Sequence, residues 1–144
     1  MLIKLENLIT ELKVDNITGD LTTDVTGIAY DSRNVEDGDL FVAITGFETD
    51  GHQYIDQAIA NGANSILVEK DIKETEATVL QVADTRSALA QVSAKFYGYP
   101  ADDLTIIGVT GTNGKTTTTH LIRVILENAG YQTGLIGTIG NYIN

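Results

Sequence analysis

The stretch GVTGTNGKTTTTH, residues 108–120, holds three glycines, one lysine and four consecutive threonines, and it follows the apolar run LTII at 104–107. Glycines allow a backbone to wrap closely around a ligand, and the first amides of a helix have no partner within the helix. Together with the helix dipole, these amides attract an anion. The lysine supplies a positive charge for phosphate oxygens, and the threonine supplies a hydroxyl that suits Mg²⁺. The stretch therefore predicts a phosphate-binding loop between a strand and a helix.

The loop is a variant of the usual phosphate-loop pattern G-x-x-x-x-G-K-[ST]. Five residues before Gly114 stands Val109 rather than a glycine, and the sequence around the lysine is T-G-T-N-G-K-T. An ordinary glycine-rich turn with an incidental lysine is the alternative interpretation. The strand pattern before the loop and the helix pattern after it favour phosphate binding.

The residues on either side of the loop predict one βαβ unit. It comprises a strand at 104–109, a helix at about 115–129 that stops at Gly130, and a strand at 133–139. One such unit cannot bury both faces of its sheet, so we expect it to be the first βαβ unit of a larger P-loop domain.

Upstream of the loop, strand and helix patterns alternate, which predicts an α/β fold with a largely parallel sheet. The expected strands are 25–33, 40–44, 65–69 and 78–83, the expected helices are 3–13, 52–62 and 86–97, and a polar connection runs through Asp24. The runs LFVAI and SILVE are continuously apolar, as in strands that are buried on both faces. The only proline, Pro100, bars helix continuation. We therefore expect a small N-terminal α/β domain over 1–100 and a truncated P-loop domain over 101–144.

Composition limits the possible partners. The chain has 144 residues, 42% of them hydrophobic, and a formal net charge of −11. Residues 1–103 carry 19 acids and 7 bases, whereas residues 104–144 carry one acid and two bases. An acidic protein repels nucleic acid, while the nearly neutral loop region accepts an anion more easily. Cysteine is absent, and no apolar run approaches the ~18 residues of a membrane span. We expect a cytoplasmic protein that binds neither nucleic acid nor membrane.

The variant loop TGTNGKTT resembles the ATP loop of the Mur ligases, ATP-dependent enzymes that build the peptide of bacterial cell-wall precursors. Residues 31–63 are similar to the family's uridine-nucleotide-binding N-terminal domain, residues 82–100 to its last helix and linker, and residues 134–140 to the next strand of the ATPase domain. The pairing of DSR at 31–33 with this loop is most similar to the branch that adds the third peptide residue. That branch joins L-lysine or meso-diaminopimelate to UDP-MurNAc-L-Ala-D-Glu. The branch that adds D-Ala-D-Ala is the alternative.

The resemblance implies a reaction in which a substrate carboxylate takes the γ-phosphoryl group of ATP, and an amine then displaces phosphate from the acyl phosphate. It implies ATP and Mg²⁺ as cofactors, Lys115 as the catalytic cation and Thr116 as a magnesium ligand. Ser32 corresponds to the family's contact with the UDP end of the substrate, and the loop 46–51 is expected to help cradle that end. The residues expected to contact ATP are Gly111, Thr112, Asn113, Gly114, Lys115, Thr116 and Thr117.

The family's remaining active-site elements correspond to positions beyond residue 144, so we expect the isolated chain to have no ligase activity. Two other functions stay open. The first part of the chain could be a free-standing UDP-sugar-binding module. The loop could also belong to an ordinary P-loop kinase or GTPase, although the first part resembles neither.

Several polar residues also have purely structural interpretations. Asp31 and Arg33 could form a local ion pair rather than a ligand site. His52 and His120 are expected to cap or pack at helices, and their separation argues against a histidine metal site. The acids between 69 and 76 are expected to be solvated surface.

Overall fold

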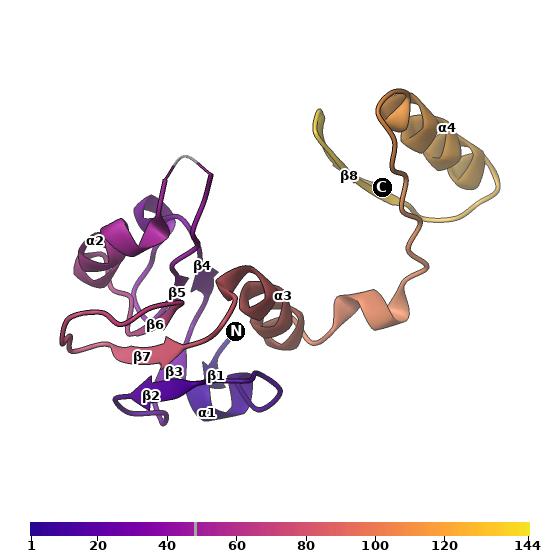
Figure 1. Ribbon diagram of the computed structural model, residues 1–144. Helices are drawn as coiled ribbons and strands as arrows, with labels where there is room; N and C mark the ends of the chain where they lie inside the picture. The colour runs from indigo at the N-terminus through magenta and orange to yellow at the C-terminus, as the bar shows by residue number, and fades with distance from the viewer. Residues whose placement is uncertain (48) are drawn as a thin grey trace. The chain divides into compact units, whose positions relative to one another are not determined.

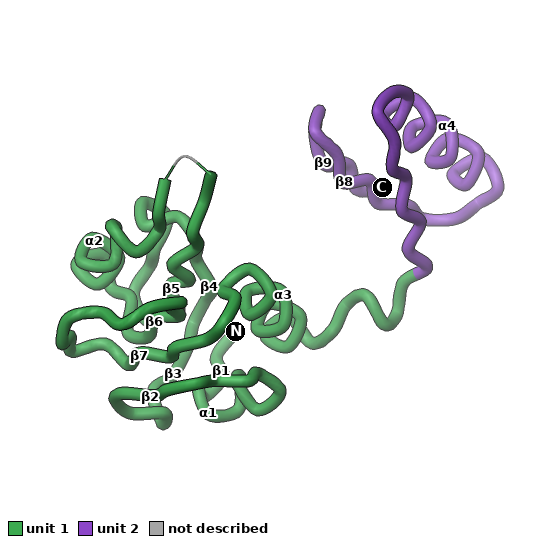
Figure 2. Tube along the Cα trace, viewed as in Figure 1, with its two compact units in different colours: residues 1–104 green, residues 105–144 purple. Residues whose placement is uncertain are grey.

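The computed structural model describes residues 1–47 and 49–144, which form two compact units. Unit 1 comprises Met1–Leu104 and unit 2 comprises Thr105–Asn144 (Figures 1 and 2). No helix among the described residues has both the length and the apolar character that a membrane crossing requires.

Unit 1 is built on a five-stranded sheet with the strand order β2-β7-β6-β5-β4. The strands are β2 Asn16–Thr18, β4 Ile28–Ala29, β5 Leu40–Val42, β6 Ser65–Val68 and β7 Thr78–Gln81. Strands β4 to β7 run parallel to one another, and only β2 at the edge is antiparallel to its neighbour β7. The predicted α/β class with a largely parallel sheet is therefore confirmed.

Helices cover both faces of this sheet (Figure 1). The helix α2 Ile55–Ala60 follows a 3-10 turn at Gly51–Tyr54, and the longer helix α3 is Thr85–Phe96. Alternate residues of β5 enter different cores, because successive side chains of a strand point to opposite faces. Leu40 and Val42 join the core formed with α3, whereas Phe41 joins the core formed with α2. This two-sided burial explains why the central strands are continuously apolar.

The N-terminal helix is shorter than the sequence predicts. The expected helix 3–13 is reduced to the single turn α1 Leu5–Leu8, because the preceding strand β1 Ile3–Lys4 pairs with β3 Asp24–Val25. The apolar residues behind the prediction are nevertheless directed inward: Leu5, Leu8 and Ile9 are buried and Leu12 packs against them. The spacing correctly indicated the buried face but not the backbone conformation.

The expected strand 25–33 is divided between two sheets. Its first residue belongs to β3, which pairs with β1, and its middle belongs to β4, which pairs with β5 in the main sheet. Its end is a 3-10 turn over Ser32–Asn34. The polar connection before it contains the edge strand β2, whose three residues are all exposed. An exposed edge strand lacks the apolar pattern that would have revealed it.

Unit 2 consists of the helix α4 Lys115–Asn128 and a hairpin of β8 Gly134–Gly137 and β9 Gly140–Ile143. The helix and its stop at Gly130 agree with the prediction. The expected strand at 104–109 is not formed, and β8 pairs antiparallel with β9 instead of parallel to that segment. The prediction of a βαβ unit was wrong in these two details. A strand needs a hydrogen-bonded neighbour, and residues 104–109 pair with none of the described strands.

Unit 2 leaves most of its apolar side chains in contact with solvent. Leu135 is the one buried hydrophobic residue among those described in this unit. Ile107 before the loop, Leu121 and Ile125 on α4, and Ile136 on β8 are all more than half exposed. In contrast, both hydrophobic cores consist entirely of residues from unit 1.

Candidate functional site

The glycine-rich loop ends where α4 begins, at Lys115. Gly114 lies at the N-cap with φ +78°, and Gly111 has φ +148°, both in the region that favours glycine. The first helical backbone bond runs from the amide of Thr118 to the carbonyl of Gly114 at 2.9 Å. The amides of residues 115–117 therefore precede the helical ladder and point out of the helix start. This is the geometry that favours an anion.

The side chains that complete the loop are accessible. All seven residues predicted to contact ATP, 111–117, are exposed. The ammonium of Lys115 bends back over the loop and donates to the carbonyl of Gly111. A cavity of about 220 Å³ lies beside it, lined by Lys115, Thr116, Thr119 and His120 and by residues of β8 and of the β8–β9 turn. The loop thus places the positively charged side chain of Lys115 next to a cavity that can admit a ligand.

The hydroxyl of Thr116 suits a metal ion whose other coordinating oxygens come mainly from a bound nucleotide and water. It forms no hydrogen bond within the part of the chain that the structure describes, although the backbone carbonyl of Thr116 accepts from Thr119 at 2.9 Å. No cluster of three acidic, histidine or cysteine side chains able to hold a metal occurs among the described residues. Mg²⁺ is commonly bound through one or two protein oxygens together with phosphate oxygens and water. The residues present therefore fit a magnesium ion that arrives with a nucleotide.

His120 has the packing role expected of it. Its ring meets the ring of Tyr142 edge-on at 5.3 Å, and the guanidinium of Arg123 lies 5.0 Å from the same aromatic ring. These contacts connect α4 to the hairpin. His120 also lines the cavity beside the loop.

Ser32 lies in unit 1, in the turn that follows β4. It is 6% exposed, its hydroxyl donates to Gln57 at 2.8 Å, and its carbonyl accepts from Asn61 at 2.8 Å. Both partners belong to α2 or its C-terminal end. The helix therefore fixes the position of Ser32, and the hydroxyl oxygen keeps lone pairs that can still accept a hydrogen bond.

Asp31 and Arg33 form the local ion pair. The guanidinium of Arg33 donates to the two carboxylate oxygens of Asp31 at 2.9 and 2.6 Å, and the amide of Arg33 donates to the same group at 3.0 Å. The side-chain hydrogen bond from Arg33, followed by the backbone one, lowers the pKa of Asp31 to about 2. The ion pair caps the turn that carries Ser32, as the structural interpretation predicts.

The loop after β5 lies at the same edge of the sheet as Ser32. Strands β4, β5 and β6 are parallel, so the segments that follow them meet at one edge, where α/β proteins bind their ligands. Thr45 and Asp50 pair across the loop, and the amide of Gly46 donates to the carbonyl of Thr49 at 2.9 Å. Phe47 is fully exposed. Of the predicted cradle 46–51, residue 48 lies outside the described residues.

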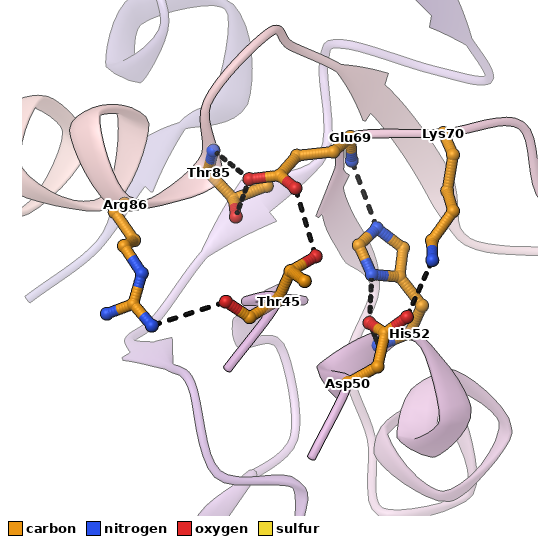
Figure 3. Close-up of polar contacts among 7 residues, drawn as sticks. All are labelled: Thr45, Asp50, His52, Glu69, Lys70, Thr85 and Arg86. Atoms are coloured by element: carbon orange, nitrogen blue, oxygen red, sulfur yellow. Dashed lines mark hydrogen bonds and ion pairs between the residues drawn. The ribbon is translucent and has the colours of Figure 1, made fainter. Parts of the chain in front are cut away.

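A polar network joins both ends of this loop to β6 and α3 (Figure 3). The carboxylate of Glu69 accepts from the amide of Thr85 at 2.9 Å, from its hydroxyl at 2.8 Å and from the hydroxyl of Thr45 at 3.0 Å. Burial would raise the pKa of Glu69, but these hydrogen bonds outweigh it and leave the pKa lowered. The expectation that all acids between 69 and 76 are solvated surface was wrong for Glu69. Its place directly after the buried strand SILV is the signal that could have identified it.

His52 belongs to the same network as a structural residue. Its Nδ1 lies 2.6 Å from Asp50, and its Nε2 accepts from the amide of Glu69 at 3.0 Å. Because an amide can only donate, Nε2 must be unprotonated, and the neutral ring carries its proton on Nδ1. Lys70 donates to the second oxygen of Asp50 at 2.6 Å. The hydrogen bond from Lys70, followed by those from His52, holds the pKa of Asp50 well below its usual range.

A parallel α/β unit with a polar edge, followed by a phosphate-type loop at a helix start, is an arrangement in which α/β proteins commonly bind nucleotides. Residues 24–97 match the family model described as Mur ligase family, catalytic domain, and residues 109–144 match the Mur ligase middle domain. The first match alone covers more than half of the chain, and the chain belongs to the Mur ligase family.

Individual relatives agree with this assignment. The chain is 48% identical over 140 residues to a UDP-N-acetylmuramoyl-L-alanyl-D-glutamate–2,6-diaminopimelate ligase of Clostridium perfringens, covering 96% of this chain and 29% of that protein. A solved structure of a ligase of the same name has a TM-score of 0.74 at 27% identity, over 99% of this chain and 29% of that one. A MurF ligase from Thermotoga maritima in complex with ADP has a TM-score of 0.56 at 34% identity, over 70% and 23%. The chain thus spans under a third of the length of these relatives.

Proposed function

We propose that this chain is the N-terminal part of an ATP-dependent ligase of peptidoglycan synthesis that joins meso-diaminopimelate to UDP-MurNAc-L-Ala-D-Glu. The observation that carries the proposal is the helix start at Lys115, where free amides and an ammonium group stand together in a Mur ligase chain. The relative from Clostridium perfringens favours diaminopimelate over L-lysine. A reaction that uses ATP and a UDP-nucleotide would place the complete protein in the cytoplasm.

In this proposal residues 101–144 begin the ATP-binding domain. The backbone amides of the loop Gly111–Thr117 would surround the β- and γ-phosphates, and Lys115 would leave the carbonyl of Gly111 to neutralise the charge that develops during phosphoryl transfer. Thr116 would offer its hydroxyl to Mg²⁺. Bound ATP with Mg²⁺ supplies an activated phosphoryl group, which converts a carboxylate into a reactive acyl phosphate. A similar MurF ligase was solved in complex with ADP, which supports the binding of an adenine nucleotide.

Residues 1–100 would bind the UDP end of the substrate. Ser32 and the described loop residues 46–47 and 49–51 follow parallel strands at their carboxyl edge, the edge at which α/β proteins bind ligands. Ser32 would accept a hydrogen bond through the lone pairs that Gln57 leaves free. Arg33 remains paired with Asp31 and supports the turn rather than the ligand.

Calorimetry on the 144-residue chain tests the two binding functions separately. UDP-MurNAc-L-Ala-D-Glu should bind, UDP should compete with it, and ADP with Mg²⁺ should bind without competing. A chain shortened to residues 1–104 should still bind the UDP-peptide and should no longer bind ADP with Mg²⁺. Failure of the UDP-peptide to bind would refute the role of unit 1, and failure of ADP to bind at millimolar concentration would refute that of the loop.

The alternatives predict different results. A ligase that adds D-Ala-D-Ala would prefer the UDP-MurNAc-tripeptide to the dipeptide substrate. A non-catalytic UDP-sugar module would bind its sugar nucleotide and ignore ADP. A kinase or GTPase would bind guanine or adenine nucleotides without any UDP-peptide. The proposed ligase requires preference for the UDP-dipeptide together with adenine nucleotide binding, and the isolated chain should release no phosphate above background.

A further inference from the structure

The loop between β5 and α2 is held by a carboxylate outside the loop, that of Glu69, which directly follows the neighbouring strand β6. We propose that Glu69 is a positioning residue for the UDP-substrate, acting through Thr45 to hold the described residues of the loop, 45–47 and 49–51, in the arrangement that receives the ligand. The inference rests on the proposed function of unit 1, because it assigns Glu69 to the substrate that unit 1 is proposed to bind. Glu69 itself need not touch that substrate.

The carboxylate of Glu69 joins three segments that are distant in sequence. One oxygen accepts from the amide and the hydroxyl of Thr85, at the first residue of α3, and the other accepts from the hydroxyl of Thr45 (Figure 3). Thr85 is completely buried, so its end of the contact is immobile. Hydrogen bonds to a carboxylate are stronger than neutral ones and specify direction. Glu69 thereby fixes Thr45 relative to the end of β6 and the start of α3.

The other end of the loop is attached to the same strand end. Asp50 contacts His52 through one oxygen and Lys70 through the other, and the ring of His52 accepts from the amide of Glu69. Arg86 adds a hydrogen bond to the carbonyl of Thr45 at 3.2 Å. Glu69 therefore contacts the first end of the loop through Thr45, and Lys70 contacts the second end through Asp50.

The loop has few interactions of its own that could replace this attachment. Among its described residues, the amide of Gly46 donates a hydrogen bond to the carbonyl of Thr49, and the amide of Gly51 donates to the carbonyl of Ile44 just before the loop. Phe47 contributes no burial because it is fully exposed. A segment with few buried contacts opens at low cost, so its shape depends on the groups that hold its ends. Loss of the Glu69–Thr45 bond should therefore loosen the loop without unfolding the sheet.

Two substitutions separate this role from a general structural one. Thr45→Val removes the hydroxyl that Glu69 holds and leaves the bonds between Glu69 and Thr85 in place. Glu69→Ala removes both. Glu76→Ala is the matched control, because Glu76 is exposed and forms no hydrogen bond or ion pair with the described residues. Thr45→Ser returns the hydroxyl to the first variant.

The readouts are affinity for UDP-MurNAc-L-Ala-D-Glu by calorimetry and amide hydrogen exchange in the 144-residue chain. We expect Thr45→Val to weaken binding roughly tenfold, Glu69→Ala at least as much, and Thr45→Ser to restore most of it. The amides of Gly46 and Gly51 should exchange about tenfold faster in the first two variants, while the amide of Ala43 stays unchanged. The control should match the unaltered chain in both measurements.

The outcomes distinguish this inference from the proposed function. If the unaltered chain does not bind the UDP-dipeptide, the function of unit 1 is refuted, and the positioning role falls with it. If the unaltered chain binds and Thr45→Val binds equally well, the positioning role alone is refuted. Weaker binding with unchanged exchange at Gly46 and Gly51 also refutes it, because the loop would then have kept its shape.

Discussion

At the scale of single residues, the side chains proposed to bind or position ligands stand at the ends of regular elements. Lys115 is the first residue of α4, Ser32 opens the turn after β4, and Glu69 follows β6 directly. At such positions the backbone supplies free amides or a sharp change of direction, and a single polar side chain completes the site.

Lys115→Ala in the complete ligase should lower ATP-dependent turnover about a hundredfold or more, because the ammonium proposed to neutralise the transferring phosphoryl group is lost. Lys73→Ala, at an exposed position in unit 1, serves as the charge-matched control and should leave turnover unchanged. Phosphate release under saturating substrate measures both. Retained activity in the Lys115 variant would remove that residue from its proposed role.

Ser32→Ala should raise the KM for the UDP-substrate roughly tenfold and change kcat by no more than about threefold, because binding far from the reacting group is lost equally in ground and transition states. Steady-state kinetics with varied UDP-dipeptide at saturating ATP provides the test. A fall in kcat with unchanged KM would place Ser32 near the chemistry instead.

Asp50 should make unit 1 sensitive to acid. Its folded pKa is lowered by Lys70 and His52, so the unfolded chain binds a proton more readily than the folded one. The stabilisation is present above the unfolded pKa of about 4 and is lost as the pH falls through the lower folded value. The unfolding free energy of Asp50→Asn, measured by urea titration, should therefore fall less between about pH 6 and pH 3 than that of the unaltered chain. Equal losses would show that the ion pair does not contribute.

At the scale of secondary-structure elements, three helices stop in the same way. After α2, α3 and α4 a glycine with positive φ closes the end, at Gly62, Gly98 and Gly130. In each, the glycine amide and the following amide bond back to carbonyls of the last turn. The expected helix ends at 62, 97 and about 129 lie close to the observed ends, and at Gly130 the glycine itself was part of the prediction, since periodicity and the glycine stop are both local signals.

Gly62→Ala should destabilise unit 1 more than Gly98→Ala. Both glycines have positive φ, +111° and +74°, so both substitutions incur backbone strain of about 1 kcal/mol or more. At Gly62 a new Cβ would also lie 2.7 Å from the Cα of Asp37, whereas at Gly98 it would meet nothing within 4 Å. The difference in unfolding free energy, from urea titration, should exceed about 1 kcal/mol. Equal losses would mean that the chain near Asp37 yields easily.

At the scale of the whole molecule, the two units differ in how completely they bury their apolar side chains. Unit 1 has a core on each face of its sheet, and both cores use only its own residues. Unit 2 has a well-formed loop and helix but no buried residue on α4. The glycine-rich loop and its helix thus form from local sequence, whereas a sheet needs partner strands, and residues 104–109 pair with none of those described.

Removing residues 105–144 should change the unfolding free energy of unit 1 by less than about 1 kcal/mol, because no core side chain is lost. Urea unfolding of the shortened and the complete 144-residue chain, followed by far-ultraviolet circular dichroism, measures the difference. Hydrogen exchange should meanwhile be faster throughout α4 than in β5 and β6. A loss of several kcal/mol on shortening would show that unit 1 depends on the second unit.

The amino-acid sequence by itself determined the α/β class, the two fully buried strands and the helix that starts at the phosphate loop. Each of these follows from a continuous or periodic local pattern, such as LFVAI, SILVE or TNGKT. Only the tertiary structure decided that Ile3–Lys4 form a strand, that residues 104–109 do not, and that Glu69 holds Thr45. These outcomes depend on partners 20 or more residues away, or on the lack of one, and no local pattern encodes which distant segment will pair.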